Sequence, residues 1–552
     1  MNDAASVPVA AILHARSGRW LERALLFAFV VHGLGMLSMA ALLLPGMPGG
    51  SQGAVAARMV YVAAHPWLWR LGWLPWQLTA LADALLAVAL LRTPWIPKRP
   101  AWLALVVTLC AIVPDQSGQA LWDTVGVALA AQGNLARYAT FERSTFSLIA
   151  AGGGAGYTLA AVFWSICLAR AGVWTRGMTM FSWLLWGAFG LLALLAALPG
   201  GMGLPQWVVG AGNAISFVLL LLWLARAAEL VIRRARPETA WGRYARWRYP
   251  RRAVGRLIDP LANSRFLRAL GEYLPVIAFR SDIEHVVYTN YLTPAEQVQP
   301  LVPQGLDLQR IGPAGRFALV SLLTYRHGHF GPRIAGPLRR LFPSPIQSNW
   351  RLYVSDPRTG QRGIYFLINA VTGLPQSLGA RFFSEGMPMH VPRGAEVRQT
   401  ADGAWAVTLD PGDGSAPDLV ANLQPCANQP DAGPWASAFA SYAEMLAYAV
   451  PQDRALTVQP WHAWVTRQEI RLDIPLDDCQ PLAGAVSSRA LQALVGDAEP
   501  FSFIVPGVFF RFDAERHDRW PRKWWSAGAK SPYRPELSRQ PESPERRPSG
   551  RD

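Results

Sequence analysis

Three side chains in the C-terminal half have the chemistry of an anion-binding or acid–base site. Arg351 lies in an alternating apolar run that predicts a β-strand, and a guanidinium makes paired hydrogen bonds to a carboxylate. Glu385 and His390 flank a Gly-Met-Pro turn and are side chains that transfer protons in catalysis. We predict that Arg351, Asn349, Met389 and His390 bind a ligand, with Glu385 and His390 as candidate acid and base. The alternative is that Arg351 pairs with a nearby acid and that Glu385 and His390 are ordinary rim residues.

Metal binding has weaker support. The alternating spacing of His327-Gly328-His329 is expected to place both imidazoles on one face of a strand, and a third ligand such as His390 would complete a zinc site. No acidic or cysteine signature accompanies the pair, and the four cysteines form no CxxC motif. We therefore expect no metal and no cofactor.

Two titratable residues, Asp83 and His32, lie inside long apolar runs. Ionisable groups at membrane depth are costly and commonly mark ion or proton pathways. The same residues also serve to hydrogen-bond two helices together. Both interpretations remain open from the sequence.

The apolar runs that contain these residues fill positions 24–225 and predict an all-α, multi-pass membrane bundle, because a bilayer core takes about 20 helical residues. The expected spans, five long and one short, are Ala24–Leu44, Leu71–Leu91, Ala101–Val113, Thr145–Leu168, Met178–Leu198 and Pro205–Ala225. The stretch Ala120–Gln132 carries Asp123, and we expect it to be re-entrant, interfacial or packed inside the bundle. A seventh crossing there would move the C-terminal half to the other side of the membrane.

The arginine and lysine distribution predicts the orientation. With six spans, the segments on the side of the N-terminus carry 20 such residues and the opposite loops carry 4. Positive loops stay in the cytoplasm. The sequence thus predicts a plasma (inner) membrane protein with residues 1–23 as a cytoplasmic tail and both termini inside.

A basic linker is expected over residues 226–273, where positions 226–268 hold twelve arginines against three acids, with tryptophan and tyrosine interleaved. This composition suits anionic head groups at a membrane interface as well as nucleic acid. The position directly after the last span favours lipid, so we predict no nucleic-acid partner. The arginines expected to contact anionic phospholipid are Arg243, Arg246, Arg248, Arg251 and Arg252.

Short strands separated by Pro and Gly turns follow in residues 274–515 and predict a mainly-β (α+β) domain, a barrel or curled sheet with an internal cavity. The expected strands are 283–290, 316–326, 349–355, 363–371, 404–409, 461–474 and 501–512, with helices at Thr293–Leu301 and Trp435–Ala449. Residues 516–552 are rich in Pro, Ser, Arg and Glu and predict a disordered tail.

A family resemblance rests on a series of short motifs in this domain. The series includes Tyr288-Thr289-Asn290-Tyr291-Leu292-Thr293-Pro294, Asn349-Trp350-Arg351-Leu352-Tyr353-Val354 and Gly386-Met387-Pro388-Met389-His390. In order and spacing it resembles the uncharacterised YqjF-like family, a domain of unknown function with an acetoacetate decarboxylase-like fold, over roughly residues 275–515. The resemblance implies a β-cone with a ligand cavity. The membrane half resembles no family that we identify.

The resemblance also bears on chemistry. In the decarboxylases a Gly-x-Pro motif precedes two lysines, of which the first forms a Schiff base and the second lowers its pKa. Met389 and His390 occupy those positions here, and no lysine occurs between Lys98 and Lys523. Without an amine no imine forms, so acetoacetate decarboxylase activity is excluded.

Together these features predict a membrane protein whose cytoplasmic β-cone binds a small, anionic molecule without Schiff-base chemistry. Two alternatives stay open. One is a membrane-associated enzyme that acts on a small acidic or lipid-derived substrate through Arg351, Glu385 and His390. The other is a transporter that uses Asp83 and His32 and is regulated by the soluble domain. Oligomeric state and ligand identity are left open.

Overall fold

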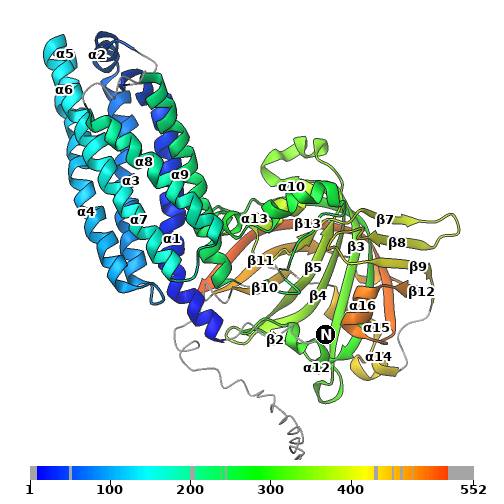
Figure 1. Ribbon diagram of the computed structural model, residues 1–552. Helices are drawn as coiled ribbons and strands as arrows, with labels where there is room; N and C mark the ends of the chain where they lie inside the picture. The colour runs from blue at the N-terminus through cyan, green and yellow to red at the C-terminus, as the bar shows by residue number, and fades with distance from the viewer. Residues whose placement is uncertain are drawn as a thin grey trace, which may run out of the picture.

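The computed structural model describes residues 9–48, 53–198, 206–236, 238–242, 245–427, 433–450, 453–459, 464–474 and 476–519. Within these residues six helices are long and apolar enough to cross a membrane: Gly18–Gly46, Pro66–Arg92, Lys98–Gln132, Leu135–Arg170, Arg176–Ala197 and Gly210–Arg234. The predicted helical bundle is therefore confirmed. Its labelled helices in Figure 1 are α1 (Val9–Ser38), α2 (Val55–Ala64), α3 (Pro66–Arg92), α4 (Lys98–Leu121), α5 (Val127–Gln132), α6 (Leu135–Ser147), α7 (Gly154–Arg170), α8 (Arg176–Ala197) and α9 (Gln206–Ala235).

The stretch 120–132 is neither a seventh crossing nor re-entrant. It continues α4 through a π-helical turn (Trp122–Gly126) into α5, so that 98–132 is one rod about 52 Å long. Pro114, expected to end a helix, lies inside α4. A proline inside a membrane helix is tolerated where neighbouring helices re-satisfy the backbone. The rod and its partner, which runs from Leu135 to Arg170, extend past the membrane thickness together.

The C-terminal half is a closed β-barrel with a sheet extension (Figure 1). The ring runs β1-β3-β4-β5-β10-β11-β13 and closes because β13 also pairs with β1. From β13 the sheet continues outward through β12, β9, β8 and β7. The strands are β1 (Phe279–Pro294), β2 (Asp307–Leu308), β3 (Phe317–Pro332), β4 (Ile346–Asp356), β5 (Gln361–Val371), β6 (Met389–His390), β7 (Gly394–Gln399), β8 (Trp405–Asp410), β9 (Leu419–Pro425), β10 (Arg454–Gln459), β11 (Trp464–Asp473), β12 (Gln480–Ser487) and β13 (Pro500–Arg519).

All seven predicted strands are present, although β3 and β13 run six and seven residues past their expected ends. The strands that were not predicted are β2, β6, β7, β9, β10 and β12. The first predicted helix is one short turn pair, α12 (Ala295–Val298) followed by Gln299–Leu301. The second is broken into α14 (Gly433–Ala438) and α15 (Tyr442–Ala449), because Ser441 has an extended backbone and caps α15 through the amide of Glu444. Of the predicted disordered tail, residues 516–519 belong to β13, and residues from 520 onward lie outside the described part of the chain.

Alternation along the strands divides the apolar residues between two cores. One set, which includes Trp350 and Leu352, packs against β8, β9 and α16 (Arg489–Val495) outside the ring. The other set, which includes Tyr288, Tyr325 and Tyr353, packs with α14 and α15. Neighbours in sequence therefore lie in different cores, which is the period of two expected for strands.

Buried contacts join the barrel to the bundle. Arg236, directly after α9, pairs with Glu22 of α1 and, at 2.7 Å, with Glu272 of the barrel half. The ring of Phe266 in α11 (Arg265–Gly271) meets that of Phe29 in α1 edge-on at 4.8 Å. The two halves therefore share one packed interface.

Residues 226–273 differ from the predicted basic linker. Residues 226–235 continue α9, and the following segment folds onto the barrel. Trp247, expected at a lipid interface, is fully buried beside Val391 and donates to Ser377 Oγ at 3.3 Å. The side chains of Arg246, Arg248, Arg251 and Arg252 are exposed, and Arg243 lies outside the described residues, so lipid contact through these arginines stays a prediction.

Candidate anion site

Arg351 is the central residue of the candidate site. It lies on β4, where alternation turns it into the core lined by tyrosines, and only 3% of it is exposed. Its Nη2 donates to Tyr353 OH at 3.2 Å and to the backbone carbonyl of Ala449 at 2.8 Å. The guanidinium carbon lies 5.5 Å from the ring centres of Tyr288 and Tyr353. Two aromatic faces and the C-terminal carbonyl of α15 therefore hold the guanidinium in place.

No acidic side chain neutralises Arg351 among the residues that the structure describes. The phenol of Tyr288 supplies no negative charge either, because burial raises its pKa to about 12, although the charge of Arg351 acts to lower it. Its Nε has no hydrogen-bond partner in the described chain. Buried charges in proteins are normally paired. A bound anion would supply the negative charge and the acceptor for Nε that the described residues do not.

A polar chain that begins at Asn349 runs along the barrel interior. Asn349, two residues before it on the same strand face, donates to Tyr325 OH at 3.0 Å and accepts from Gln347 Nε2 at 2.7 Å. Gln347 Oε1 then meets His327 Nε2 at 2.9 Å, and His327 Nδ1 meets Ser281 Oγ at 2.8 Å. The predicted ligand residues Arg351 and Asn349 thus share one face of β4, and their hydrogen bonds go to different partners.

A surface hollow of about 600 Å³ lies on the other side of this core. Its lining includes Arg310, Arg362 and Tyr448, and the ring of Tyr448 stacks on that of Tyr353 at 5.2 Å. Arg310 pairs with Glu296 at 2.9 Å, whereas Arg362 is exposed. Glu444 also lines the hollow, so its lining carries both signs of charge. Tyr448 lies between this hollow and the residues that hold Arg351.

Glu385 is not a rim residue, since only 3% of it is exposed. Its backbone amide donates to Glu515 Oε1 at 2.7 Å, and Ser384 Oγ donates to the other oxygen of that carboxylate at 2.9 Å. Gln468 Nε2 also donates to Glu515 at 2.8 Å. The turn that carries Glu385 is thus tied to β13.

His390 is also buried, on the two-residue strand β6. Its Nδ1 lies 2.6 Å from Ser415 Oγ. Burial, with the charges of Arg381 and Arg268, lowers the pKa of His390 well below its ordinary value. Met389 precedes it and pairs across the sheet with Asn369, which itself pairs with Asn349.

Arg351, Glu385 and His390 have separate partners. No hydrogen bond or ion pair joins any two of them within the described residues. The structure therefore places Arg351 and Asn349 on one face of β4 and Met389 two strands away, and gives no contact among the described residues that assembles the acid–base set. Tyr353 and Tyr288 were not predicted as site residues; Tyr353 was detectable, because it lies two residues after Arg351 on the same strand face.

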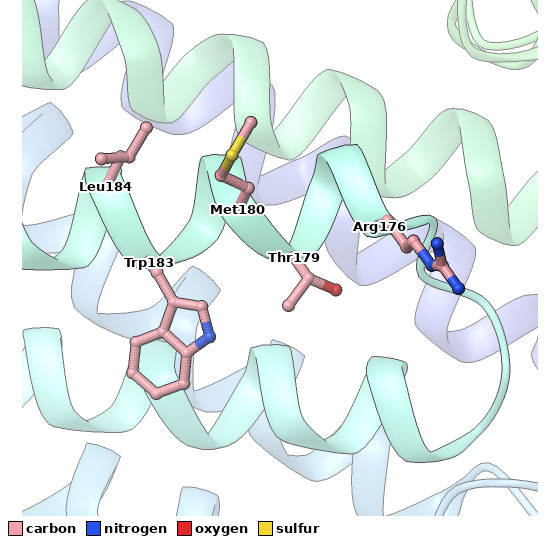
Figure 2. A pocket seen from close by; sticks show the side chains of 5 residues that line it. All are labelled: Arg176, Thr179, Met180, Trp183 and Leu184. Atoms are coloured by element: carbon pink, nitrogen blue, oxygen red, sulfur yellow. The ribbon is translucent and has the colours of Figure 1, made fainter.

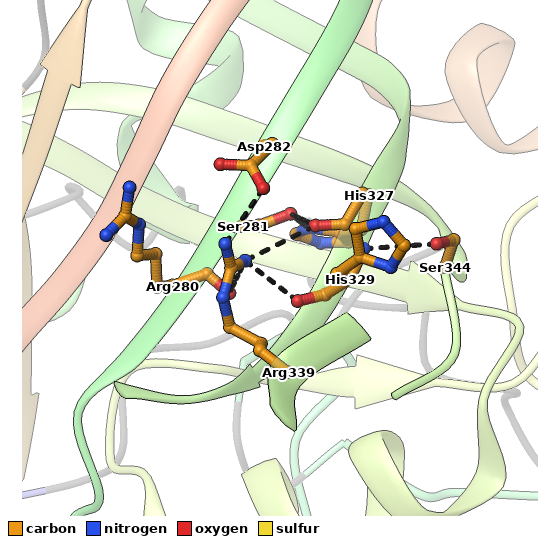
Figure 3. A network of polar contacts seen from close by, with 8 residues as sticks. Arg280, Ser281, Asp282, His327, His329, Arg339 and Ser344 are labelled. Atoms are coloured by element: carbon orange, nitrogen blue, oxygen red, sulfur yellow. Dashed lines mark hydrogen bonds and ion pairs between the residues drawn. The ribbon is translucent and has the colours of Figure 1, made fainter. Parts of the chain in front are cut away.

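The expected shared face of His327 and His329 is wrong (Figure 3). His329 has a φ of 51°, which breaks the alternation, so His327 is buried and His329 is exposed. Among the residues described, no group of three or more His, Cys, Asp or Glu side chains is placed to hold a metal ion.

His327 predicts a pH dependence of stability. Burial lowers its pKa from 6.5 to about 4, so the unfolded chain binds this proton first as the pH falls. We expect the free energy of unfolding to be unaffected by His327 above pH 6.5 and to fall by roughly 3 kcal/mol between pH 6.5 and 4. Urea unfolding at several pH values measures this. His327→Gln should flatten the dependence, whereas the exposed His329→Gln should not, and equal slopes in both variants would count against the assignment.

In the bundle, His32 Nε2 lies 3.9 Å from Asp83 Oδ1, and both residues are buried. His32 Nδ1 also lies 2.8 Å from the carbonyl of Ala28. Asp115 of α4, which the sequence analysis did not single out, is buried as well and accepts from Tyr157 OH at 3.2 Å and from Gln119. These polar contacts link α1 with α3, and α4 with α7. The transporter interpretation of Asp83 and His32 stays a prediction.

A second hollow, of about 490 Å³, lies on the outer face of α8 (Figure 2). Its lining is Arg176, Thr179, Met180, Trp183 and Leu184. The three apolar side chains are more than half exposed. In a membrane-spanning helix this face contacts lipid.

Similarity to known proteins is found for part of the chain. Residues 280–485 match the model of DUF2071, described as "Uncharacterized conserved protein (COG2071)", which confirms the family expected from the motifs. No curated protein matches the chain. An acetoacetate decarboxylase-like enzyme from Sphingomonas wittichii RW1 is 8% identical, with a TM-score of 0.32, and covers 45% of this chain and 95% of its own. The enduracididine biosynthesis enzyme MppR complexed with pyruvate is 13% identical, with a TM-score of 0.31, over 44% of this chain and 91% of its own.

Proposed function

We propose, from a C-terminal half that carries a DUF2071 domain, that the barrel is a receptor for a small anion and that the bundle holds it at the inner face of the cell membrane. The observation that supports this proposal is the buried guanidinium of Arg351, which has no acidic partner among the described residues. A carboxylate at its Nε would supply the missing charge and hydrogen bond. The absence of lysine between Lys98 and Lys523 argues against Schiff-base chemistry at the same place.

The orientation in this proposal follows the arginine and lysine distribution, since the end of the bundle that carries the barrel also carries the excess of positive residues. The hollow lined by Arg362, Glu444 and Tyr448 supplies the route to the site. The exposed Arg362 at this entrance attracts anions. Rotation of Tyr448 away from Tyr353 would connect this hollow with Arg351.

A screen of anions tests the receptor function. Purified full-length protein in lipid nanodiscs would be heated with a panel of small mono- and dicarboxylates and with inorganic phosphate. At 100 times its Kd a bound anion adds about 2.7 kcal/mol to stability, so at least one carboxylate should raise the unfolding temperature of the parent. Arg351→Met should abolish that shift, whereas Arg362→Gln, on the rim, should keep it with slower binding. A shift of equal size in the parent and in Arg351→Met would disprove the assignment.

A further inference from the structure

The exposed apolar side chains of the barrel half gather at one end. From residue 250 onward, twelve large apolar side chains are exposed in the described part of the chain. One of them, Val420, lies on β9, away from the other eleven. The other eleven occupy α10 (Arg252–Ala262), the segment before β1, the 3₁₀ segment η8 (Arg333–Leu341) with Phe342, and the last residue of α13 (Leu374–Phe383). A soluble domain rarely concentrates exposed apolar surface in this way without a partner.

Strand topology places these segments at the bundle end of the barrel. η8 follows β3, whose last residue pairs with the first residue of β1, and Arg333 N donates to the carbonyl of Ala278. β1 begins eight residues after α11, which packs on α1 and α9. α13 packs on α11, and α10 directly precedes α11 in the chain. α10 packs on α13 in turn.

The position of α11 along α1 places the bundle end of the barrel at the membrane surface. The span from Gly18 to Gly46 has 29 residues, about 43 Å, against a hydrocarbon core of about 30 Å. Phe29 lies about 16 Å along the helix from Gly18. The helix is thus longer than the hydrocarbon core by about 13 Å. Even if all of that extra length projected beyond the core at the Gly18 end, Phe29 would lie within the core. Phe266 touches Phe29, so α11 reaches acyl-chain depth and its neighbours lie at the level of the head groups.

η8 has the composition of a membrane-inserting segment. Ile334, Leu338 and Leu341 are 95%, 65% and 83% exposed. Arg339 holds the segment on the barrel: its guanidinium bonds Asp282 Oδ2 and the carbonyl of His329, both at 2.8 Å (Figure 3). Arg340 is exposed beside it. On α10, Leu257 is 77% exposed with Arg256 next to it.

We infer that η8 and α10 form a membrane-docking face that inserts its apolar side chains into the leaflet beside the bundle, with Arg256 and Arg340 on anionic phospholipid head groups. Apolar side chains rimmed by arginine are typical of interfacial segments, and each such arginine adds attraction to an anionic surface. The barrel then has three attachments to the leaflet: the bundle, η8 and α10. Its axis is fixed relative to the membrane, with the interior network that ends at His327 and Ser281 pointing toward the lipid.

Spin labelling of the full-length protein tests this inference. In a background with Cys110 and Cys426 replaced by Ser, nitroxides would be placed at Leu338→Cys or Leu341→Cys, with Val420→Cys as an exposed apolar control on β9. In liposomes of phosphatidylcholine and phosphatidylglycerol, labels at 338 and 341 should collide with oxygen and lose collisions with a water-soluble nickel chelate, whereas the label at 420 should do the opposite. Leu184→Cys on α8 supplies the lipid-exposed reference.

A label at 338 or 341 that reads like the one at 420 would overturn the docking face. The part played by charge is tested separately in pure phosphatidylcholine, where both labels should become shallower. Unchanged depth there would overturn the assignment of Arg256 and Arg340 to anionic head groups.

Discussion

Arg351→Met is expected to stabilise the ligand-free protein by about 1–3 kcal/mol, because it removes a buried charge that lacks an acidic partner and replaces it with an apolar side chain of similar length. The carbonyl of Ala449 keeps a donor in the variant, since Tyr353 OH also bonds it at 2.7 Å. Denaturant unfolding of both proteins in the same nanodiscs gives the difference.

Arg381→Met is the matched control. Arg381 is fully buried too, but it donates to the carbonyls of Ala245 and Ala262 and so ties the segment after α9 to α13. We expect this variant to lose stability by about 2–4 kcal/mol. If Arg351→Met were destabilised by as much, Arg351 would be a structural residue and the receptor proposal would lose its support.

Arg236→Ala is expected to cost about 3–5 kcal/mol, because it leaves two buried carboxylates, Glu22 and Glu272, without their shared cation. These residues join α1, the end of α9 and the barrel half, so the loss should also loosen the barrel from the bundle. Thermal unfolding followed by protease sensitivity of residues 236–278 measures both effects.

Arg233→Ala serves as its control. Arg233 pairs with Glu229 one turn earlier on α9, and its own side chain is 43% exposed, whereas that of Glu229 is 7% exposed. The Glu229 carboxylate keeps two other donors in the variant, Ser264 Oγ and the amide of Phe266. We therefore expect a smaller loss, of about 1 kcal/mol. Equal losses in the Arg233 and Arg236 variants would show that the buried triad does not hold the two halves together.

Local pattern was enough to predict most of the architecture. Apolar runs of membrane length predicted the spans, and short runs between Pro and Gly turns predicted β1, β3, β4 and β5, because a strand buried on both faces leaves a direct mark on the sequence. β7 was missed because it is a mostly polar, exposed strand of the sheet extension. For 120–132, packing inside the bundle was one of the predicted alternatives, and Trp122, Val127 and Ala130 are buried there. The helix that leads into this stretch was predicted too short, because Pro114 and Asp115 lie inside α4 and do not end it.

The site was predictable only in part. Arg351 and Asn349 share a strand, so their common face follows from spacing alone. The contacts that hold the guanidinium of Arg351 come from Tyr288 on β1 and Ala449 at the end of α15. A local sequence pattern cannot predict contacts with segments that are distant in the chain. The position of Trp247 was predicted wrongly for the same reason. The composition of the segment around it is typical of a lipid interface, but packing against Val391 buries it.

The most direct measurement is a structure of the full-length protein in nanodiscs with the anion that gives the largest stabilisation in the screen. Density for the anion should lie within about 3 Å of Arg351 Nε, with Tyr448 turned away from Tyr353. An anion bound instead in the outer hollow between Arg310 and Arg362, with Tyr448 still stacked on Tyr353 and nothing at Nε, would contradict the central claim that Arg351 is the receptor's anion site.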